Sequence, residues 1–197
     1  RKVWLTRNLI VLTLVSFTQD AASDLLYPLL PLLMASVTSA PALLLGVTEG
    51  LADLVAGVTT MWAGKRSDIW SRRGFITTGY GLAALGKVAV AFATAWPHFT
   101  LGRALDRFGK GLRGAPRDSL LADGIDESRL GRAFGFHRAG DTAGAVLGPL
   151  IALAGLSLLD NNVREVAKWA LIPAVISLFL TFIVQDHRPK QVLARAE

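Results

Sequence analysis

Charged residues gather in one stretch of an otherwise apolar chain, and their types are suited to holding ions or carrying protons. Between Leu101 and Asp123 there are seven charged side chains: Arg103, Asp106, Arg107, Lys110, Arg113, Arg117 and Asp118. On a helix, with about 100° per residue, these charges fall within an arc of about 140° and leave the other face apolar. The pattern predicts one helix with a charged stripe.

Two kinds of chemistry fit such side chains. Arginine presents a fork of donors that matches carboxylate or phosphate oxygens. Arg103 and Arg107 are therefore candidates for holding an anionic group or for setting the protonation state of a nearby acid. A carboxylate that alternates between wet and dry surroundings can load a proton on one side and release it on the other. Asp20 is the leading candidate for that role, followed by Asp53 and Glu49. The residues alone do not choose between the two kinds of chemistry.

The composition indicates the surroundings of these charges. The 197 residues are 52% hydrophobic and 18% charged, with a mean hydropathy of +0.43, which is too apolar for an ordinary soluble domain. There is no cysteine, and the three histidines are too scattered to suggest metal ligands. We therefore expect a membrane protein with no metal site, no cofactor and no nucleic-acid partner, in which the net charge of +6 reflects where the loops lie.

Six apolar stretches are long enough for helices that cross a bilayer, which takes about 20 residues. We expect an all-α bundle over residues 1–184, with spans at about 9–37, 43–63, 75–96, 99–121, 133–159 and 166–184. Residues 185–197 form a polar cytoplasmic tail or the start of an interdomain linker. Pro28 and Pro31 predict a tilt or kink in the first span.

The orientation follows from the basic residues of the loops. The amino terminus, the second and fourth loops and the tail together carry 12 Lys and Arg residues, whereas the opposite side carries only Arg164 and Lys168. Because basic loops stay on the cytoplasmic side, both termini are expected in the cytoplasm, and the chain in an inner (plasma) membrane.

Charges within the spans must face protein or a watery cavity, because an ionisable group at the bilayer centre costs about 2.5–3.5 kcal/mol. Near the cytoplasmic ends, fixed ion pairs between helices are the favoured interpretation for Arg117, Asp118, Asp123, Arg138 and Asp141. Deeper charges favour a substrate or proton pathway, formed by Asp20, Asp24, Glu49, Asp53, Lys87, Arg103, Asp106, Arg107 and Lys110. In the second span, small and acidic residues share an arc of about 100° that is expected to pack against protein.

Three short patterns occur in order on the expected spans. They are Gly64-x-x-x-Asp68-x-x-x-Arg72-Arg73 after the second span, the basic stretch with Arg103 in the fourth, and Gly144-x-x-x-Gly148-Pro149 in the fifth. They resemble the loop signature, the basic motif and the motif of proton-coupled exporters in the major facilitator superfamily. Ser71 stands where the loop signature usually has glycine, and the glycine pair that often follows Pro149 is absent. The strings SFTQDAASDLLYPLLP, GKGLRGAPRDSLLAD and GRAFGFHRAGDTAGAVLGPL extend the resemblance over nearly the whole chain, to a broad group of bacterial members.

The resemblance implies the amino-terminal half of a major facilitator fold, with six transmembrane helices built as two inverted three-helix repeats. Such transporters hold the solute between two six-helix halves. The second half would be another copy, a separate chain or another part of the same chain. The resemblance also implies a cytoplasmic charge network that stabilises the outward-facing state, in which Asp68 and Arg72 pair near Arg117, Asp118 or Asp123. Its expected members are Gly64, Asp68, Arg72, Arg73, Arg113, Arg117, Asp118, Asp123, Arg138 and Asp141.

Three functions remain open at this point, none of them enzymatic. Proton-coupled export of a small organic solute, an antiport, rests mainly on the resemblance at Gly144, Gly148 and Pro149. Uptake or exchange of an anionic solute rests on the basic stripe. A non-transporting membrane scaffold or regulatory half-domain is the third, because the chain provides only six expected spans. The expected partners are the lipid bilayer, a small solute, protons and a second six-helix half.

Overall fold

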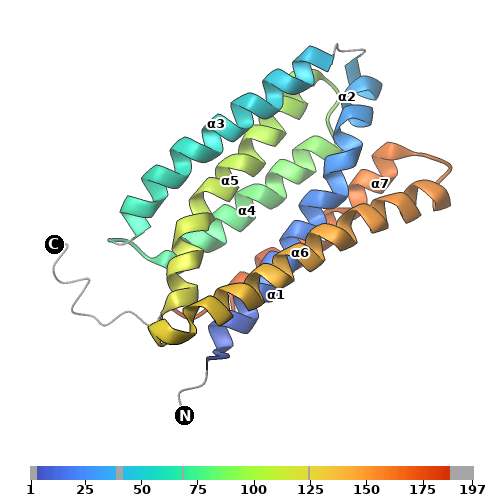
Figure 1. Cartoon of the computed structure of the whole chain (residues 1–197). Coiled ribbons are helices and arrows are strands. Elements are labelled where there is room, and N and C mark those ends of the chain that lie inside the picture. Colours follow the sequence, from blue (N-terminus) through green and yellow to red (C-terminus); the bar gives the residue numbers. More distant parts are fainter. Residues whose placement is uncertain (1–3, 39–41, 68, 124, 187–197) are drawn as a thin grey trace.

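The computed structural model describes residues 4–38, 42–67, 69–123 and 125–186, and every regular element in these ranges is a helix (Figure 1). The elements are α1 (Arg7–Leu26), the 3-10 turn η1 (Tyr27–Leu29), α2 (Leu30–Thr38), α3 (Ala42–Ser67), α4 (Arg72–Ala91), α5 (Trp96–Ala122), α6 (Glu127–Leu158), α7 (Val163–Trp169) and α8 (Leu171–Thr181). Because α1, η1 and α2 run on as one unit and α7 and α8 as another, the predicted all-helical fold of six helices is confirmed.

Prolines account for the two interrupted units. Pro28 has no N–H to donate to the carbonyl of Asp24, and the helix changes to 3-10 geometry over Tyr27–Leu29. The first unit is therefore irregular where its prolines predicted a kink. In the last unit, Pro173 cannot bond to the carbonyl of Trp169, and the break between α7 and α8 lies at the intervening Ala170.

Local capping explains several helix starts. The Thr6 hydroxyl accepts a hydrogen bond from the Leu9 N–H, and the Ser71 hydroxyl accepts one from the Gly74 N–H, both at 3.1 Å. Helix α6 begins at Glu127, earlier than its apolar stretch, with Asp126 as the N-cap residue. Its first turns are polar, so hydropathy alone does not mark where the helix starts.

The outer surface of the bundle is apolar. Within the described residues, four helical units are long and apolar enough to cross a membrane: 7–36, 43–67, 72–91 and 127–158. Helix α5 carries too many charges to meet the same criterion, and α7 and α8 are each too short. Large side chains such as Met61, Leu153 and Phe179 are exposed on the outside, as expected for helices that face lipid.

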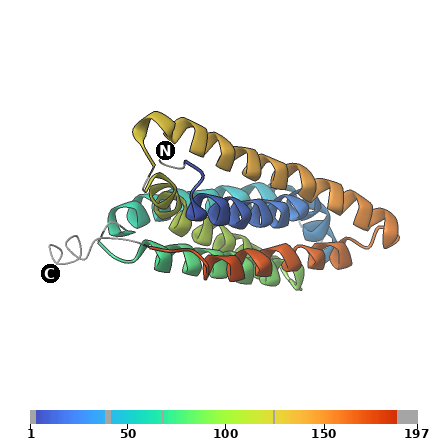
Figure 2. The same cartoon turned by 90° about the horizontal axis from the view of Figure 1, so that it is seen from below.

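The helix contacts have an internal two-fold pattern. Helix α1 packs between α6 and α8, and α5 packs between α3 and α4 (Figures 1 and 2). If the first three units are exchanged with the last three, the α1–α6 contact becomes the α5–α3 contact, and the α1–α8 contact becomes the α5–α4 contact. The α4–α8 contact maps onto itself. This pattern is that of two three-helix repeats, with α1 and α5 as equivalent helices.

The two ends of the described chain lie at the same end of the bundle. The Asn8 side chain donates to the Gln185 carbonyl oxygen at 2.6 Å and accepts from the Gln185 N–H at 3.1 Å. Six crossings bring a chain back to the side from which it started, so this contact fits the six-helix count.

The glycine face of α3, which was expected to pack against protein, has no partner helix within the described part of the chain. A Cβ atom added at Gly46, Gly50 or Gly57 would meet nothing within 4 Å. Helix α3 has a single main partner, α5, and buries Ala52 and Ala63 against it, so the small-residue face is not covered by the described part of the chain. The predicted packing of this face is therefore not provided by the chain's own helices.

Candidate functional site

A polar pocket of about 170 Å³ lies between α1 and α5. The two helices and the first residue of η1, Tyr27, contribute its lining: Asp20, Ser23, Asp24, Tyr27, Arg103, Asp106, Arg107, Lys110 and Arg113. Six of these side chains belong to the predicted solute or proton pathway. Arg113 was expected in the cytoplasmic network instead, but it lines the same pocket. The reason is helical periodicity, since Arg113 lies one turn beyond Lys110 on the same face of α5.

Glycines set how closely α5 approaches α4. A Cβ atom at Gly86 would lie 2.5 Å from the Asp106 backbone nitrogen, and one at Gly102 would lie 2.9 Å from the Val90 nitrogen. Only glycine permits backbones this close. The approach brings Lys87 of α4 to the back of the pocket wall, where its Nζ donates to Asp106 Oδ1 at 2.6 Å.

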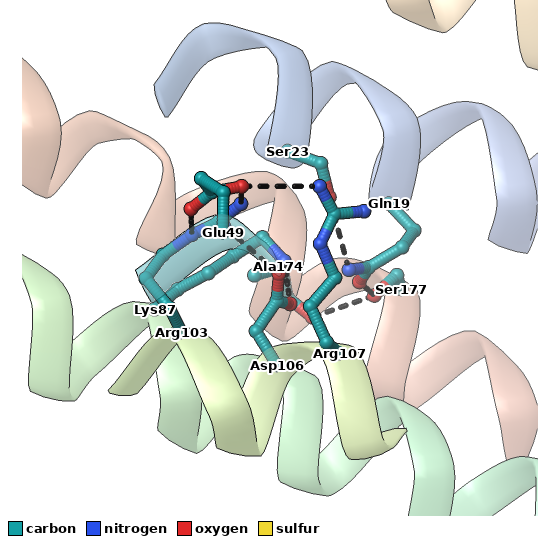
Figure 3. A network of polar contacts seen from close by, with 9 residues as sticks. All are labelled: Gln19, Ser23, Glu49, Lys87, Arg103, Asp106, Arg107, Ala174 and Ser177. Carbon is teal, nitrogen blue, oxygen red and sulfur yellow. Dashed lines mark hydrogen bonds and ion pairs between the residues drawn. The ribbon is translucent and has the colours of Figure 1, made fainter. Parts of the chain in front are cut away.

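Arg103 is the centre of a charged network (Figure 3). Its Nε and one terminal nitrogen donate to the two carboxylate oxygens of Glu49 at 2.6 and 2.7 Å, a bidentate pair that joins α5 to α3. Its other terminal nitrogen lies 3.3 Å from Asp106 Oδ2. Arg107 extends the network, 3.5 Å from Glu49 and 3.4 Å from Asp53. Glu49, Asp53 and Lys87 thus lie beside the pocket and form ion pairs with the charged side chains of its α5 wall.

Four pocket residues are outside this network. Asp20 and Asp24 on α1, and Lys110 and Arg113 on α5, form no ion pair with another described residue. Because the two acids line the α1 wall and the two bases the α5 wall, the two helices face one another with opposite charge. The pocket separates these charges.

A second buried polar cluster lies where α1, α4, α5 and α6 meet. Arg117 donates to the Ser16 hydroxyl at 3.1 Å, and Ser16 lies 3.3 Å from the Tyr80 hydroxyl and 3.5 Å from His137 Nε2. His137 lies 3.5 Å from Asp141, and Arg138 lies 3.8 Å from the other oxygen of that carboxylate. Arg117, Arg138 and Asp141, three expected network residues, therefore belong to one region.

The remaining expected network residues lie near the end of α3, at the start of α4, and in the last turns or at the C-cap of α5. Arg72 pairs with Asp123 at 2.9 Å, and Arg73 donates to the Phe182 carbonyl oxygen at 2.8 Å. Asp118 pairs with its neighbour Arg117 at 3.1 Å. Gly64 packs against α5, because an added Cβ would lie 3.6 Å from the Ala115 Cβ. Asp68 lies outside the described residues.

The expected exporter motif lies on the contact between α6 and α1. A Cβ atom at Gly148 would be 2.6 Å from both the Ala21 oxygen and the Leu25 nitrogen, and one at Gly144 would overlap the Phe17 carbonyl oxygen. Pro149 is on the exposed side of α6. The two glycines thus fix the backbone of α1 at the level of its two pocket acids.

Sequence reasoning missed several neutral residues of the site. Ser23 and Tyr27 line the pocket, and Ser177 of α8 donates to Gln19 Oε1 at 3.0 Å beside them. Ser23, Asp24 and Tyr27 follow Asp20 at intervals of three or four residues, a spacing that indicates one helical face. Tyr80 had no comparable signal, because a tyrosine in an apolar span also suits the core. Among the described residues, no three His, Asp or Glu side chains gather as a metal site requires.

Comparison with known proteins identifies the family. The model of the Major Facilitator Superfamily matches residues 12–197. The chain belongs to this superfamily. A superfamily relative described as an uncharacterised transporter, from Methanocaldococcus jannaschii, is 33% identical over 180 residues, covering 91% of the chain and 44% of the relative. The staphyloferrin B transporter of Staphylococcus aureus is 29% identical over 196 residues, or 96% of the chain and 46% of that protein.

Solved structures of superfamily members have the same fold. A bacterial homologue of the human lysosomal transporter Spinster, in an inward-facing and unoccupied conformation, matches with a TM-score of 0.77 at 17% identity, over 96% of the chain and 44% of that structure. The chain therefore spans about half the length of the relatives it matches. The superfamily consists of multi-pass membrane transporters rather than enzymes, which agrees with the sequence-based predictions on both points.

Proposed function

We propose that this chain forms half of a proton-coupled secondary transporter for a small organic solute, working by alternating access with a second six-helix half. One observation carries the proposal: the polar pocket between α1 and α5, lined by acids and bases inside membrane helices. Ionisable groups at such positions are costly and mark solute or proton pathways. A membrane scaffold would not require them.

Asp20 is the proposed proton carrier. It lies on the pocket wall, and Ser16, one helical turn earlier on α1, accepts a hydrogen bond from Arg117. It is therefore placed between the pocket and the buried cluster around Arg117. A carboxylate close to guanidinium groups changes its proton occupancy when a solute or a helix movement alters the distances between them.

The uncovered face of α3 supports a second half. A Cβ atom added at Gly46, Gly50 or Gly57 would meet nothing within 4 Å. Asp53 beside them is 68% exposed while it pairs with Arg107. A second helical half packed on this face would cover the glycines and enclose the pocket. Export is the proposed direction, from the resemblance of Gly144, Gly148 and Pro149 to the motif of proton-coupled exporters.

Uptake or exchange of an anionic solute is the second candidate. Lys110 and Arg113 favour it, because these two bases in the pocket have no carboxylate partner among the described residues. The relative from S. aureus is named as a transporter of staphyloferrin B.

The test uses inverted membrane vesicles that contain the native gene product and carry a pH gradient. A pH-sensitive dye inside the vesicles follows the protons released when candidate organic solutes are added. A transported solute should dissipate the gradient, and Asp20→Asn should abolish this coupling. Asp160→Asn, the same substitution in an exposed turn, should retain it.

Two results would contradict the proposal. Unchanged coupling in Asp20→Asn would remove Asp20 from the proton pathway. Absence of proton or solute movement for every solute, with correctly folded protein, would favour a non-transporting scaffold.

A further inference from the structure

The pocket contains bases that the network has not neutralised. Three bases in or beside it have partners: Lys87 pairs with Asp106, Arg103 with Glu49 and Asp106, and Arg107 with Glu49 and Asp53. Lys110 and Arg113 have no such partner within the described part of the chain. The positive charge left over on the α5 wall therefore belongs to these two residues.

Arg113 is the more informative of the two, because it is buried. It is only 6% exposed, and its guanidinium lies over the Tyr80 ring, 4.4 Å from the ring centroid. Its Nη1 has no hydrogen-bond partner in the described residues. A buried charged donor without an acceptor is unfavourable by about 1–3 kcal/mol or more. A hydrogen-bond acceptor supplied by a ligand would remove this free-energy penalty.

Asp24 occupies the facing wall. It lies on α1 immediately before the 3-10 turn and lines the pocket beside Ser23 and Tyr27. Lys110 lines the same pocket from α5, yet the two side chains do not form an ion pair. An acid and two bases thus face each other across a small polar space without closing it.

From this arrangement we infer that the pocket binds a zwitterionic solute, with its carboxylate between Lys110 and Arg113 and its ammonium group on Asp24. The inference rests on the proposed function and names the class of solute for that site. A simple anion would face Asp24 as a like charge, and a simple cation would face two bases. A zwitterion satisfies both walls and leaves Asp20 available for the proton.

The test measures the thermal stabilisation of the purified native gene product by three series of probes. The first series is ω-amino carboxylates of three to six carbons, the second the matching carboxylates without the amine, and the third the matching amines. At least one amino carboxylate should stabilise the protein more than its carboxylate and amine counterparts combined. Its affinity should fall about ten- to hundredfold in Lys110→Gln and in Asp24→Asn, as for the loss of one charged hydrogen bond.

Matched controls separate binding from folding. Asp160→Asn at an exposed position and Lys168→Gln at a half-buried one make the same substitutions away from the pocket and should bind the probe with unchanged affinity. Lys110 is itself exposed in the described chain, so its variant is expected to fold normally.

Three outcomes would overturn the inference: equal stabilisation by the carboxylate alone, unchanged binding in Asp24→Asn, or no stabilisation by any amino carboxylate. The first two would identify an anion site and would leave the transport proposal intact. Conversely, zwitterion binding that depends on Asp24 and Lys110, without any flux into vesicles, would support this site and contradict the proposed transport.

Discussion

Lys87 of α4 and Asp106 of α5 form an ion pair of 2.6 Å, with side chains only 1% and 8% exposed. The pair joins two neighbouring helices directly behind the pocket wall. Because both charges are desolvated, each depends on the other, and among the described residues Asp106 has only Arg103 at 3.3 Å as a further ion-pair partner.

Lys87→Met should therefore destabilise the protein strongly. Removing one partner of a buried pair costs about 3–5 kcal/mol, because the remaining charge stays buried. Thermal unfolding followed by intrinsic fluorescence measures the loss. The double variant Lys87→Met/Asp106→Asn should be less destabilised than the sum of its single variants. Strict additivity would show that the two side chains are not coupled.

Arg103→Lys tests the bidentate contact with Glu49. Lysine keeps the charge but lacks the fork that contacts both carboxylate oxygens, so we expect a loss of about 1.5–3 kcal/mol in unfolding free energy. Asp53→Asn is the control, because the Asp53 side chain is 68% exposed and its pair with Arg107 should contribute no more than about 1 kcal/mol. Equal losses in the two variants would contradict a special role for the fork.

Gly148→Ala tests the contact between α6 and α1. The new methyl group would press on the backbone of Ala21 and Leu25, and overpacking of this kind costs about 1–3 kcal/mol. Gly135→Ala is a matched control in the same helix, where a Cβ meets nothing within 4 Å; it should stabilise by about 0.5–1 kcal/mol. Opposite signs in thermal unfolding are expected, and a neutral Gly148→Ala would argue against close packing there.

Arg72→Ala tests the proposal that the Arg72–Asp123 pair is a cytoplasmic latch, a contact that stabilises one state of the transport cycle. Asp123 is 51% exposed, so loss of this pair should change the unfolding free energy by less than about 1 kcal/mol. Solute flux in vesicles should fall more than this stability loss explains, if the pair stabilises one state of the transport cycle. High salt should reduce flux in the native protein toward that of the variant, since exposed pairs are screened. Flux that is unaffected by both changes would remove the latch from the mechanism.

Much of the fold could be predicted from the sequence, because the length and spacing of apolar stretches decide the number of helices and prolines mark their irregular points. The pairings inside the site could not. Lys87 and Asp106 meet because Gly86 and Gly102 let two backbones approach, and one-dimensional spacing does not report how helices rotate against one another. Arg113 was predicted in the cytoplasmic network because of its distance along α5. It lines the pocket because it shares a helix face with Lys110.

The repeat relation between α1 and α5 has a consequence for the pocket itself. The two helices occupy equivalent places in the two halves of the contact pattern, yet within the described chain the pocket acids without an ion pair lie on α1 and the pocket bases without one lie on α5. Two identical repeats would give both walls the same sign of charge, and the electric field across the pocket would have no preferred direction. The departure from symmetry creates a local dipole, which would orient a solute that carries one of its own.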